Sequence, residues 1–311
     1  MTTNKYAPEG TLIATAENRE YISSVYGLER ARLEEKILEG VVDKCDNETY
    51  TLHVDLNGID GIIRREECVF GENPKDIAII TRVGKSVAFK VMQIIKEEGK
   101  KPVAILSRKE AQRECVNNYL MDLIPGDIIP AKITHFENFG AFVDIGCGVN
   151  SLICIDSVSV SRISSPTERF KMREELSVVV KSIDYDTGRI YVSTRELFGT
   201  WEENASMFSQ GQTVSGIIRS IESYGIFVEL SPNLAGLAEL KEGVEVGQSC
   251  AVYIKNIMPE KMKIKLVIID SYNSKLTTHQ PKYFIDTDKV KHLDYWRYSP
   301  KNCDKLIETV F

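Results

Sequence analysis

The stretch ITHFENFGAFVDI at residues 133–145 decides the fold, because it returns 85 residues later as IRSIESYGIFVEL at residues 218–230. Identical residues include the pairs Gly140/Gly225 and Phe142/Phe227. A fainter copy lies upstream, where YTLHVDL at residues 50–56 matches FGAFVDI at residues 139–145. Self-similarity of this kind indicates one structural unit used several times. We therefore expect three copies of one module, the first of them degenerate.

Each copy has the pattern of a small β-structure. The central repeat contains five short apolar segments separated by turn signals, at residues 128–136, 139–145, 152–155, 177–184 and 189–194. The sequence DYDTG between the last two is typical of a hairpin turn. Five strands with no helix inside the repeat suit a closed barrel of the oligonucleotide/oligosaccharide-binding (OB) kind. The predicted fold is mainly β, with three tandem five-stranded OB barrels.

Helical patterns lie before and between the repeats, at residues 17–39, 108–123 and 196–208. Apolar or small residues recur there at helical spacing, for example Ala111 and Cys115. The expected division is an N-terminal helical extension (1–35), a degenerate barrel (36–110), a linker helix (111–125), the central barrel (126–195), a second linker helix (196–208), a third barrel (209–270) and a basic, aromatic tail (271–311).

Composition excludes several classes of protein. The 39 Lys and Arg residues against 45 Asp and Glu give a net charge of −6, so a general basic coat for nucleic acid is absent. Seven cysteines without a CxxC pair argue against a disulfide framework or a zinc site. No apolar run approaches the roughly 18 residues that cross a bilayer, and no secretory signal pattern is seen. We expect a cytoplasmic protein without metal, cofactor or membrane partner.

Two segments resemble nucleotide-binding motifs but lack glycines that those motifs require. VGKS at residues 83–86 ends like a phosphate-binding loop, but the leading glycine position holds Ile79. GCGVN at residues 146–150 lacks the third glycine of a dinucleotide site. The sequence has no nucleophile elbow and no acidic cluster typical of metal-dependent nucleases. We therefore predict neither an enzyme nor a small-molecule substrate.

Strand alternation predicts which side chains face solvent. Between residues 141 and 145 the aliphatic residues form the buried set, so Phe142 and Asp144 point outward. The same rule places these pairs outward in the other repeats: Phe227 with Glu229, and His53 with Asp55. In the last strand of the central repeat it exposes Arg189, Tyr191 and Ser193. Phe139 falls on the opposite face unless a bulge at Gly140 returns it.

Exposed rings on a small barrel can stack nucleobases, and each stacked base contributes about 1–3 kcal/mol. The alternative is that these rings pack on a linker helix or on a neighbouring repeat. The recurrence of the ring at matched positions favours a ligand-binding face.

Three segments carry a resemblance to a known family: residues 126–146 (GDIIPAKITHFENFGAFVDIG), 150–160 (NSLICIDSVSV) and 183–197 (IDYDTGRIYVSTREL). They resemble the RNA-binding repeat of bacterial ribosomal protein S-one, a family of tandem OB barrels. LFGTWEENASMF at residues 197–208 also resembles connectors of the low-GC Gram-positive branch. The resemblance covers residues 36–270 and is strongest in the central repeat.

In that family two aromatic residues, a histidine, an aspartate and an arginine form the RNA surface. The resemblance implies that Phe139, Phe142, Asp184 and Arg189 fill four of these positions in the central repeat. Cys154 stands at the histidine position, which implies weaker binding. Tyr191 is the outward neighbour of Arg189.

The other repeats depart further from the family pattern. The third repeat offers Tyr224 and Phe227, with Glu239, Met258 and Lys263 at the histidine, aspartate and arginine positions. A carboxylate facing phosphate is unfavourable, so weaker binding is expected there. The first repeat offers Tyr50 and His53, with Arg64 at the histidine position and Lys100 or Lys101 near the arginine position.

The resemblance implies a non-catalytic protein that binds single-stranded RNA, notably mRNA, in translation, with the small ribosomal subunit as a partner. Two alternatives remain open. One is a protein-docking scaffold or regulator in a ribonucleoprotein complex, which would use the first repeat and the N-terminal helix. The other is the targeting arm of an RNA-degrading enzyme, which the absence of a catalytic domain disfavours. The tail, from Lys275 onward, either binds single strands or packs back on the third repeat.

Overall fold

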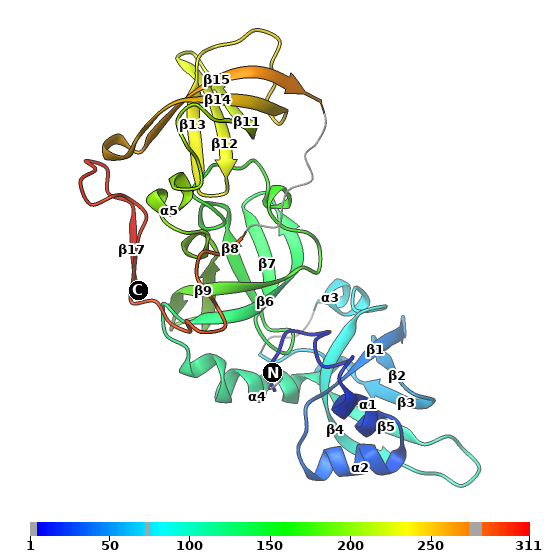
Figure 1. The fold of residues 1–311 in the computed structure, drawn as a ribbon. Coiled ribbons are helices and arrows are strands. Elements are labelled where there is room, and N and C mark those ends of the chain that lie inside the picture. Colours follow the sequence, from blue (N-terminus) through cyan, green and yellow to red (C-terminus); the bar gives the residue numbers. More distant parts are fainter. Residues whose placement is uncertain (1–4, 72–74, 274–281) are drawn as a thin grey trace. The chain divides into compact units, whose positions relative to one another are not determined.

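The computed structural model describes residues 5–71, 75–273 and 282–311, and these ranges contain three closed five-stranded barrels (Figure 1). The predicted set of tandem barrels is therefore confirmed. The first barrel has the strand order β1-β2-β3-β5-β4. Its strands are β1 (Leu38–Cys45), β2 (Leu52–Leu56), β3 (Ile59–Ile63), β4 (Ser86–Ile95) and β5 (Val103–Ser107).

The second and third barrels repeat this plan. The second consists of β6 (Ile128–Glu137), β7 (Gly140–Asp144), β8 (Asn150–Cys154), β9 (Glu175–Asp184) and β10 (Arg189–Ser193), in the order β10-β8-β7-β6-β9. The third consists of β11 (Thr213–Glu222), β12 (Gly225–Ser231), β13 (Leu234–Ala238), β14 (Ser249–Met258) and β15 (Lys263–Tyr272), in the order β11-β12-β13-β15-β14. In every barrel the third and fifth strands pair in parallel, which closes the sheet.

Helices lie where the sequence predicts them, in shorter pieces. The expected helix over 17–39 is two helices, α1 (Ala16–Ile22) and α2 (Val25–Leu33), because Ser24 caps α2 by accepting from the Gly27 N–H. The expected helix over 108–123 is α4 (Arg108–Asn118) followed by a 3-10 turn (Leu120–Asp122). The second linker is a 3-10 turn (Arg195–Phe198) and α5 (Trp201–Ala205). The remaining elements are α3 (Asp76–Ile80) and the 3-10 turns Arg65–Glu67, Ile155–Ser157, Pro166–Glu168 and Pro259–Lys261.

The chain divides into two compact units. The first comprises Met1–Leu123, Pro130–Lys132 and Asp144–Asn150, and the second comprises Ile124–Ile129, Ile133–Val143 and Ser151–Phe311. Within the described ranges, no helix is both long enough and apolar enough to cross a membrane.

Alternation predicts the barrel interiors correctly. Its inward set is buried, with Leu230 half-buried: Leu52, Val54, Leu56, Ala141, Val143, Ile145, Ile226, Val228, Ile190 and Val192. On the predicted outer face, Asp55 and Arg189 are exposed, whereas His53, Phe142, Tyr191 and Phe227 are half-buried.

Asp144 is an exception to the alternation rule, because it is only 2% exposed. Its carboxylate accepts from the backbone N–H of Glu9 at 2.7 Å, and from those of Gly146 and Gly148. Burial raises the pKa of Asp144 to about 7. The outward placement predicted for Asp144 is therefore wrong, since the N-terminal segment covers this position.

Glu229 is also buried rather than exposed, and the reason is again a partner distant in sequence. It accepts from Arg169 Nη2 at 2.5 Å and from Arg219 Nε at 2.8 Å. Arg169 lies in the segment between β8 and β9 of the second barrel, so this network ties the second barrel to the third. Ser193, which was also expected outside, is buried, and its hydroxyl donates to the Ser157 carbonyl at 3.0 Å.

The described part of the tail packs against the second unit. Trp296 and Tyr298 join the hydrophobic core of the third barrel. Tyr283 stacks on Phe198 and its hydroxyl donates to the Ser177 carbonyl at 3.2 Å. The tail also forms a small antiparallel sheet from β16 (Tyr295–Arg297) and β17 (Glu308–Val310). Packing on the third repeat is thus confirmed for Trp296 and Tyr298, whereas Tyr283 packs on the second linker and the second barrel instead. Lys275 lies outside the described residues.

Candidate nucleic-acid interface

Two aromatic rings stand together at the β6–β7 turn of the second barrel. Phe139 is 55% exposed, and its ring lies edge-on to that of Phe142, with centroids 6.1 Å apart and planes at 85°. Because β7 begins at Gly140, Phe139 belongs to the turn and strand alternation does not govern it. The turn therefore brings the two rings onto one face.

A glycine is needed at position 140 because the backbones of β7 and β8 lie very close together there. A Cβ built on Gly140 would lie 2.3 Å from the carbonyl oxygen of Ile153 on β8. In the third barrel, the equivalent Gly225 pairs regularly with Glu222, and the register shift lies in the opposite strand, between Ile218 and Ser220. The third barrel thus has no bulge at the glycine that corresponds to Gly140.

The third barrel repeats the aromatic pair. Tyr224 is 67% exposed, and its ring meets that of Phe227 at 6.1 Å and 89°. The second and third barrels therefore present the same edge-to-face pair at the same turn, and in each pair the ring in the turn, Phe139 or Tyr224, is exposed.

His135 is a further candidate residue, which strand alternation does not reveal. Its ring stacks on Phe142, with centroids 6.3 Å apart and planes at 29°. Its Nε2 lies 2.9 Å from Glu137 Oε1. In the third barrel, Ser220 follows a register shift and pairs with Phe227. The 85-residue repeat offset maps Ser220 onto His135, so the ring at this place is not repeated and the repeat pattern gives no signal that marks His135.

Strand register defines the rest of the face. In the third barrel, Phe227 pairs with Leu237, Leu237 with Lys265, and Lys265 with Asn256. In the second barrel, Leu152 pairs with Tyr191, and Tyr191 with Ser182. Tyr191 therefore occupies the place that Lys265 has in the third barrel.

The same register aligns the predicted charged positions. Arg189 pairs with Asp184 in the second barrel, and Lys263 pairs with Met258 in the third. Asp184 accepts from the Thr187 hydroxyl at 2.6 Å and from the Asp186 N–H at 3.0 Å. These bonds hold the pKa of Asp184 below its usual value and fix the β9–β10 turn. Arg189 is thus the exposed cation of this pair.

Cys154 and Glu239 occupy equivalent places at the ends of β8 and β13, one residue after Ile153 and Ala238. Cys154 is half-buried, and burial raises the pKa of its thiol. Glu239 is exposed, with Lys255 Nζ 3.7 Å from its Oε1. The second barrel is therefore neutral at this position, whereas the third carries a carboxylate.

The first barrel departs from the pattern. The Arg65 guanidinium lies 5.0 Å from the centroid of the Tyr50 ring, and His53 Nδ1 lies 3.1 Å from Asp60. Arg64 is exposed at the end of β3. Both predicted ring positions of this barrel are thus engaged by neighbouring side chains.

The arginine position of the first barrel also differs from the prediction. Val103 pairs with Ile95, as Arg189 pairs with Asp184, so Val103 fills this position instead of Lys100 or Lys101. Lys100 pairs with Glu97 at 2.6 Å in the preceding turn. The reason is the length of the β4–β5 turn, which ends after both lysines.

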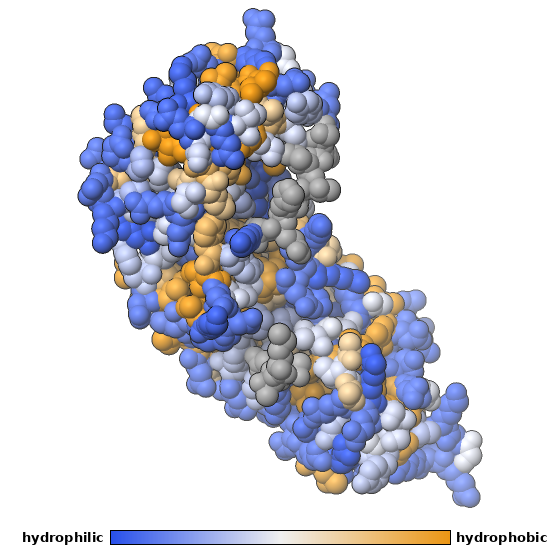
Figure 2. All heavy atoms as spheres, in the orientation of Figure 1, coloured by the Kyte–Doolittle hydropathy of each residue, from blue (hydrophilic) through white to orange (hydrophobic). Residues whose placement is uncertain are grey.

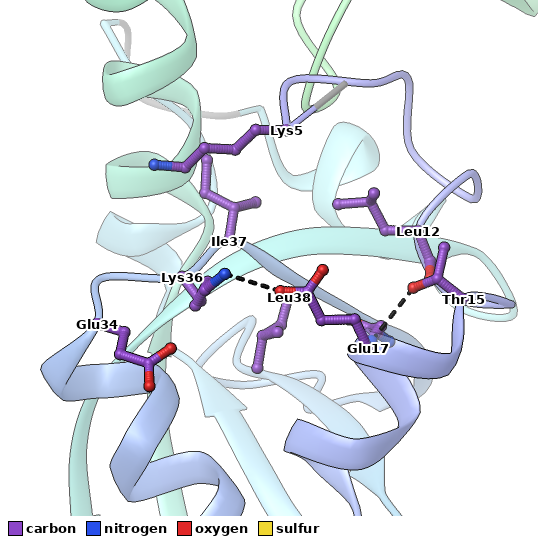
Figure 3. Close-up of a pocket in the computed structure, with 9 residues that line it drawn as sticks. Lys5, Leu12, Thr15, Glu17, Glu34, Lys36, Ile37 and Leu38 are labelled. Atoms are coloured by element: carbon purple, nitrogen blue, oxygen red, sulfur yellow. Dashed lines mark hydrogen bonds and ion pairs between the residues drawn. The ribbon is translucent and has the colours of Figure 1, made fainter. Parts of the chain in front are cut away.

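Within the described ranges, no group of three His, Cys, Asp or Glu residues could hold a metal ion. A pocket of about 370 Å³ in the first unit is lined by charged and aliphatic side chains, including Lys36, Glu17 and Leu38 (Figure 3). Lys36 is already paired with Glu17 at 2.7 Å. On the face drawn in Figure 2, apolar side chains form separate patches among hydrophilic ones.

Comparisons with known proteins match part of this chain to a described family. Residues 122–195 match the family model described as the S1 RNA binding domain. Small ribosomal subunit protein bS1 of Staphylococcus aureus (strain COL) is 30% identical over 201 residues, which cover 60% of this chain and 50% of that protein. The bS1 protein of Chlamydia muridarum is 28% identical over 224 residues, which cover 68% of this chain and 39% of that protein. The chain thus spans half or less of the length of these relatives, and the two identities do not distinguish a bacterial branch.

Two solved structures show weaker likeness. A multidomain protein with nucleic acid binding domains from Streptococcus pneumoniae is 16% identical, with a TM-score of 0.25, over 76% of this chain and 73% of that one. GSP13 from Bacillus subtilis is 26% identical, with a TM-score of 0.23, over 24% of this chain and 57% of that one.

Proposed function

Residues 122–195 belong to the S1 RNA-binding domain family, and from this premise we propose that the chain is a non-catalytic protein that binds single-stranded RNA, including mRNA, in translation. Bases stack on the exposed rings of the second barrel. The observation that carries the proposal is the edge-to-face pair of Phe139 and Phe142, repeated by Tyr224 and Phe227.

Stacking rather than charge provides most of the affinity. Every base has an aromatic face, so stacking tolerates any sequence and contributes about 1–3 kcal/mol per base. The net charge of −6 leaves only local cations, such as Arg189, to follow the phosphates. We therefore expect the salt dependence of two or three phosphate contacts, far below that of a strongly basic protein.

The three barrels contribute unequally. The second has an exposed Phe139 ring, a half-buried Phe142 ring that stacks with His135, and no carboxylate at the Cys154 position. The third keeps the rings and places Glu239 beside the path of the phosphates, where repulsion weakens binding. In the first barrel, Arg65 covers Tyr50 and Asp60 holds His53, so it contributes least.

The names of the relatives support a proposal about the cellular setting. The matched curated proteins are named as small ribosomal subunit proteins, and we propose that this chain also works with mRNA at the small subunit, in the cytoplasm. No catalytic step and no small-molecule substrate enter this function. Sedimentation of the protein with small subunits through a sucrose gradient tests the association.

The central experiment compares wild type with the double variant Phe139→Ala/Phe142→Ala. Loss of two stacking rings should weaken binding to a pyrimidine-rich oligoribonucleotide by roughly 30-fold or more, measured by fluorescence anisotropy. Tyr26→Ala removes an even more exposed ring, on α2, and serves as the control, with wild-type affinity expected. Unchanged affinity in a folded double variant would refute the proposal.

A protein-docking role remains the second candidate, for the first unit. In the row of the first barrel that corresponds to Phe227, Leu237 and Lys265, the last two positions hold Ile62 and Ile105. Val103 holds the arginine position, and all three aliphatic residues are partly exposed. Partners of a scaffold would remain bound in a pull-down from nuclease-treated lysate, whereas RNA-bridged partners would be lost.

A further inference from the structure

The three barrels share a bulge at one place in the fourth strand. In the second barrel, Tyr191 pairs with Ser182 while Val192 pairs with Val180, which leaves Lys181 out of the ladder. The same shift leaves out Met92 in the first barrel and Lys255 in the third. The same β-bulge is therefore present in all three barrels, and the bulged residue differs: Met92 in the first, Lys181 in the second and Lys255 in the third.

The bulge turns Lys181 toward the outer face. A bulge places an extra residue outside the ladder and redirects its side chain. Val180 is buried, whereas Lys181 is half-buried and Ser182, the partner of Tyr191, is exposed. Lys181 thus shares the outer side of the barrel with Tyr191.

Hydrogen bonds fix the position of the ammonium group. Lys181 Nζ donates to the Ser157 hydroxyl at 2.7 Å, in the 3-10 turn that directly follows Cys154. The backbone of this turn also meets the aromatic site, because the Ile155 N–H donates to the Phe139 carbonyl at 2.9 Å. The ammonium group therefore stands at the end of the face where Phe139 and Cys154 lie.

The positive charge of Lys181 is only weakly compensated. Asp156 Oδ2 is 4.0 Å from Nζ, and the Asp156 side chain is 71% exposed. An exposed pair at this distance contributes little, so the ammonium remains free to bind an anion. In the third barrel, Lys255 also has an exposed carboxylate nearby, that of Glu239 at 3.7 Å, but this carboxylate stands at the place that Cys154 occupies in the second barrel.

We propose that Lys181 contacts an RNA phosphate beside the base stacked on Phe139, and so supplies the contact that Cys154 cannot make. This inference rests on the proposed RNA binding and names one residue of that same face. The bulged position differs between the barrels: Lys181 serves RNA, Lys255 lies beside a carboxylate at the position equivalent to Cys154, and Met92 offers no charge.

The test measures affinity for a pyrimidine-rich oligoribonucleotide between about 50 and 200 mM salt. Lys181→Met keeps the length of the side chain, and we expect three- to tenfold weaker binding with a salt slope shallower by about 0.7, the value of one single-strand phosphate contact. Lys181→Arg should retain both values. Lys289→Met removes a paired lysine of the tail as the matched control and should leave both values unchanged.

A reciprocal exchange gives a second readout. Cys154→Glu copies the third barrel and should weaken binding as much as Lys181→Met, with little further loss when the two are combined. Glu239→Cys should strengthen binding by a protein in which Phe139→Ala/Phe142→Ala has removed the second-barrel site.

The outcomes separate the inference from the proposed function. An unchanged salt slope in Lys181→Met, together with weak binding by Phe139→Ala/Phe142→Ala, would overturn the role of Lys181 and leave RNA stacking intact. If wild type does not bind the oligoribonucleotide, both are overturned.

Discussion

The ring of His135 stacks on the ring of Phe142, with centroids 6.3 Å apart and planes 29° apart. The two residues come from neighbouring strands, and with Phe139 they form a group of three rings. The third barrel has Ser220 in the corresponding place, so its group has two.

The third ring should extend the stacking surface. We expect His135→Ala to weaken RNA binding roughly three- to tenfold, because one partial stacking contact is lost. His135→Phe keeps the ring and should bind almost as well as wild type. Ser220→His should add affinity to the third barrel. Equal affinities for His135→Ala and wild type, measured by fluorescence anisotropy, would remove His135 from the site.

Glu229 should be essential to the stability of the second unit. It compensates Arg169 and Arg219, whose side chains are only 3% and 10% exposed. Glu229→Ala leaves the buried Arg169 guanidinium without a carboxylate, while Arg219 keeps its pair with Glu168; loss of the Arg169 partner should lower the free energy of unfolding by about 3–5 kcal/mol. Urea denaturation measures the loss. The exposed Glu222→Ala should change stability by less than about 0.5 kcal/mol.

Gly140 should not tolerate a side chain. The Cβ of Gly140→Ala would lie 2.3 Å from the Ile153 carbonyl oxygen, so β7 and β8 would have to separate. We expect about 1–3 kcal/mol of destabilisation and a lower melting temperature. Gly188→Ala has no atom within 4 Å of the added Cβ, so it shows only the strain of its φ of +68°. A smaller loss for Gly140→Ala than for Gly188→Ala would contradict this role.

Glu39 should make the first unit less stable as pH rises. It accepts from the Gly10 and Ile13 N–H groups at 3.0 and 2.9 Å, but burial dominates and raises its pKa from 4.5 to about 7. A raised pKa means that stability is fully present below pH 4.5 and is lost as pH rises through about 7.

Glu39→Gln should therefore flatten the pH dependence of unfolding. The variant stays uncharged, so its stability relative to wild type should improve between pH 5 and 8 by up to about 3 kcal/mol. Denaturant unfolding at both pH values checks this. The pKa of Asp144 is also raised to about 7, so the unfolding free energy of both proteins should keep some dependence on pH. A relative stability that is constant with pH would show that Glu39 does not titrate in this range.

Local patterns in the sequence predict the barrels well. The 85-residue repeat, the turn glycines and the alternation at 141–145 depend on contacts within one barrel, and they give the strand number and the buried aliphatic residues. The same register later shows that Lys263 corresponds to Arg189. These features repeat because the physical constraint on each barrel is the same.

What alternation misses has two physical causes. Asp144 and Glu229 are buried by partners distant in sequence, Glu9 for the first and Arg169 for the second, and a pattern of period two contains no information about such partners. Lys181 lies at a register shift, as does Ser220, the counterpart of His135, and one extra residue in a strand changes which face a side chain takes.

The packing of residues 283–293 against the second barrel affects how that barrel is made. Leu293 N–H bonds to the Gly126 carbonyl, and Tyr283, Val290 and Leu293 cover Ile128 and Val179. These covering residues follow Ser193 by roughly 90 positions, which a ribosome adds in about 5 to 20 seconds. During that interval Ile128 and Val179 of the nascent barrel are exposed to solvent. Chaperones can bind this apolar surface until residues 283–293 have been synthesised and cover it.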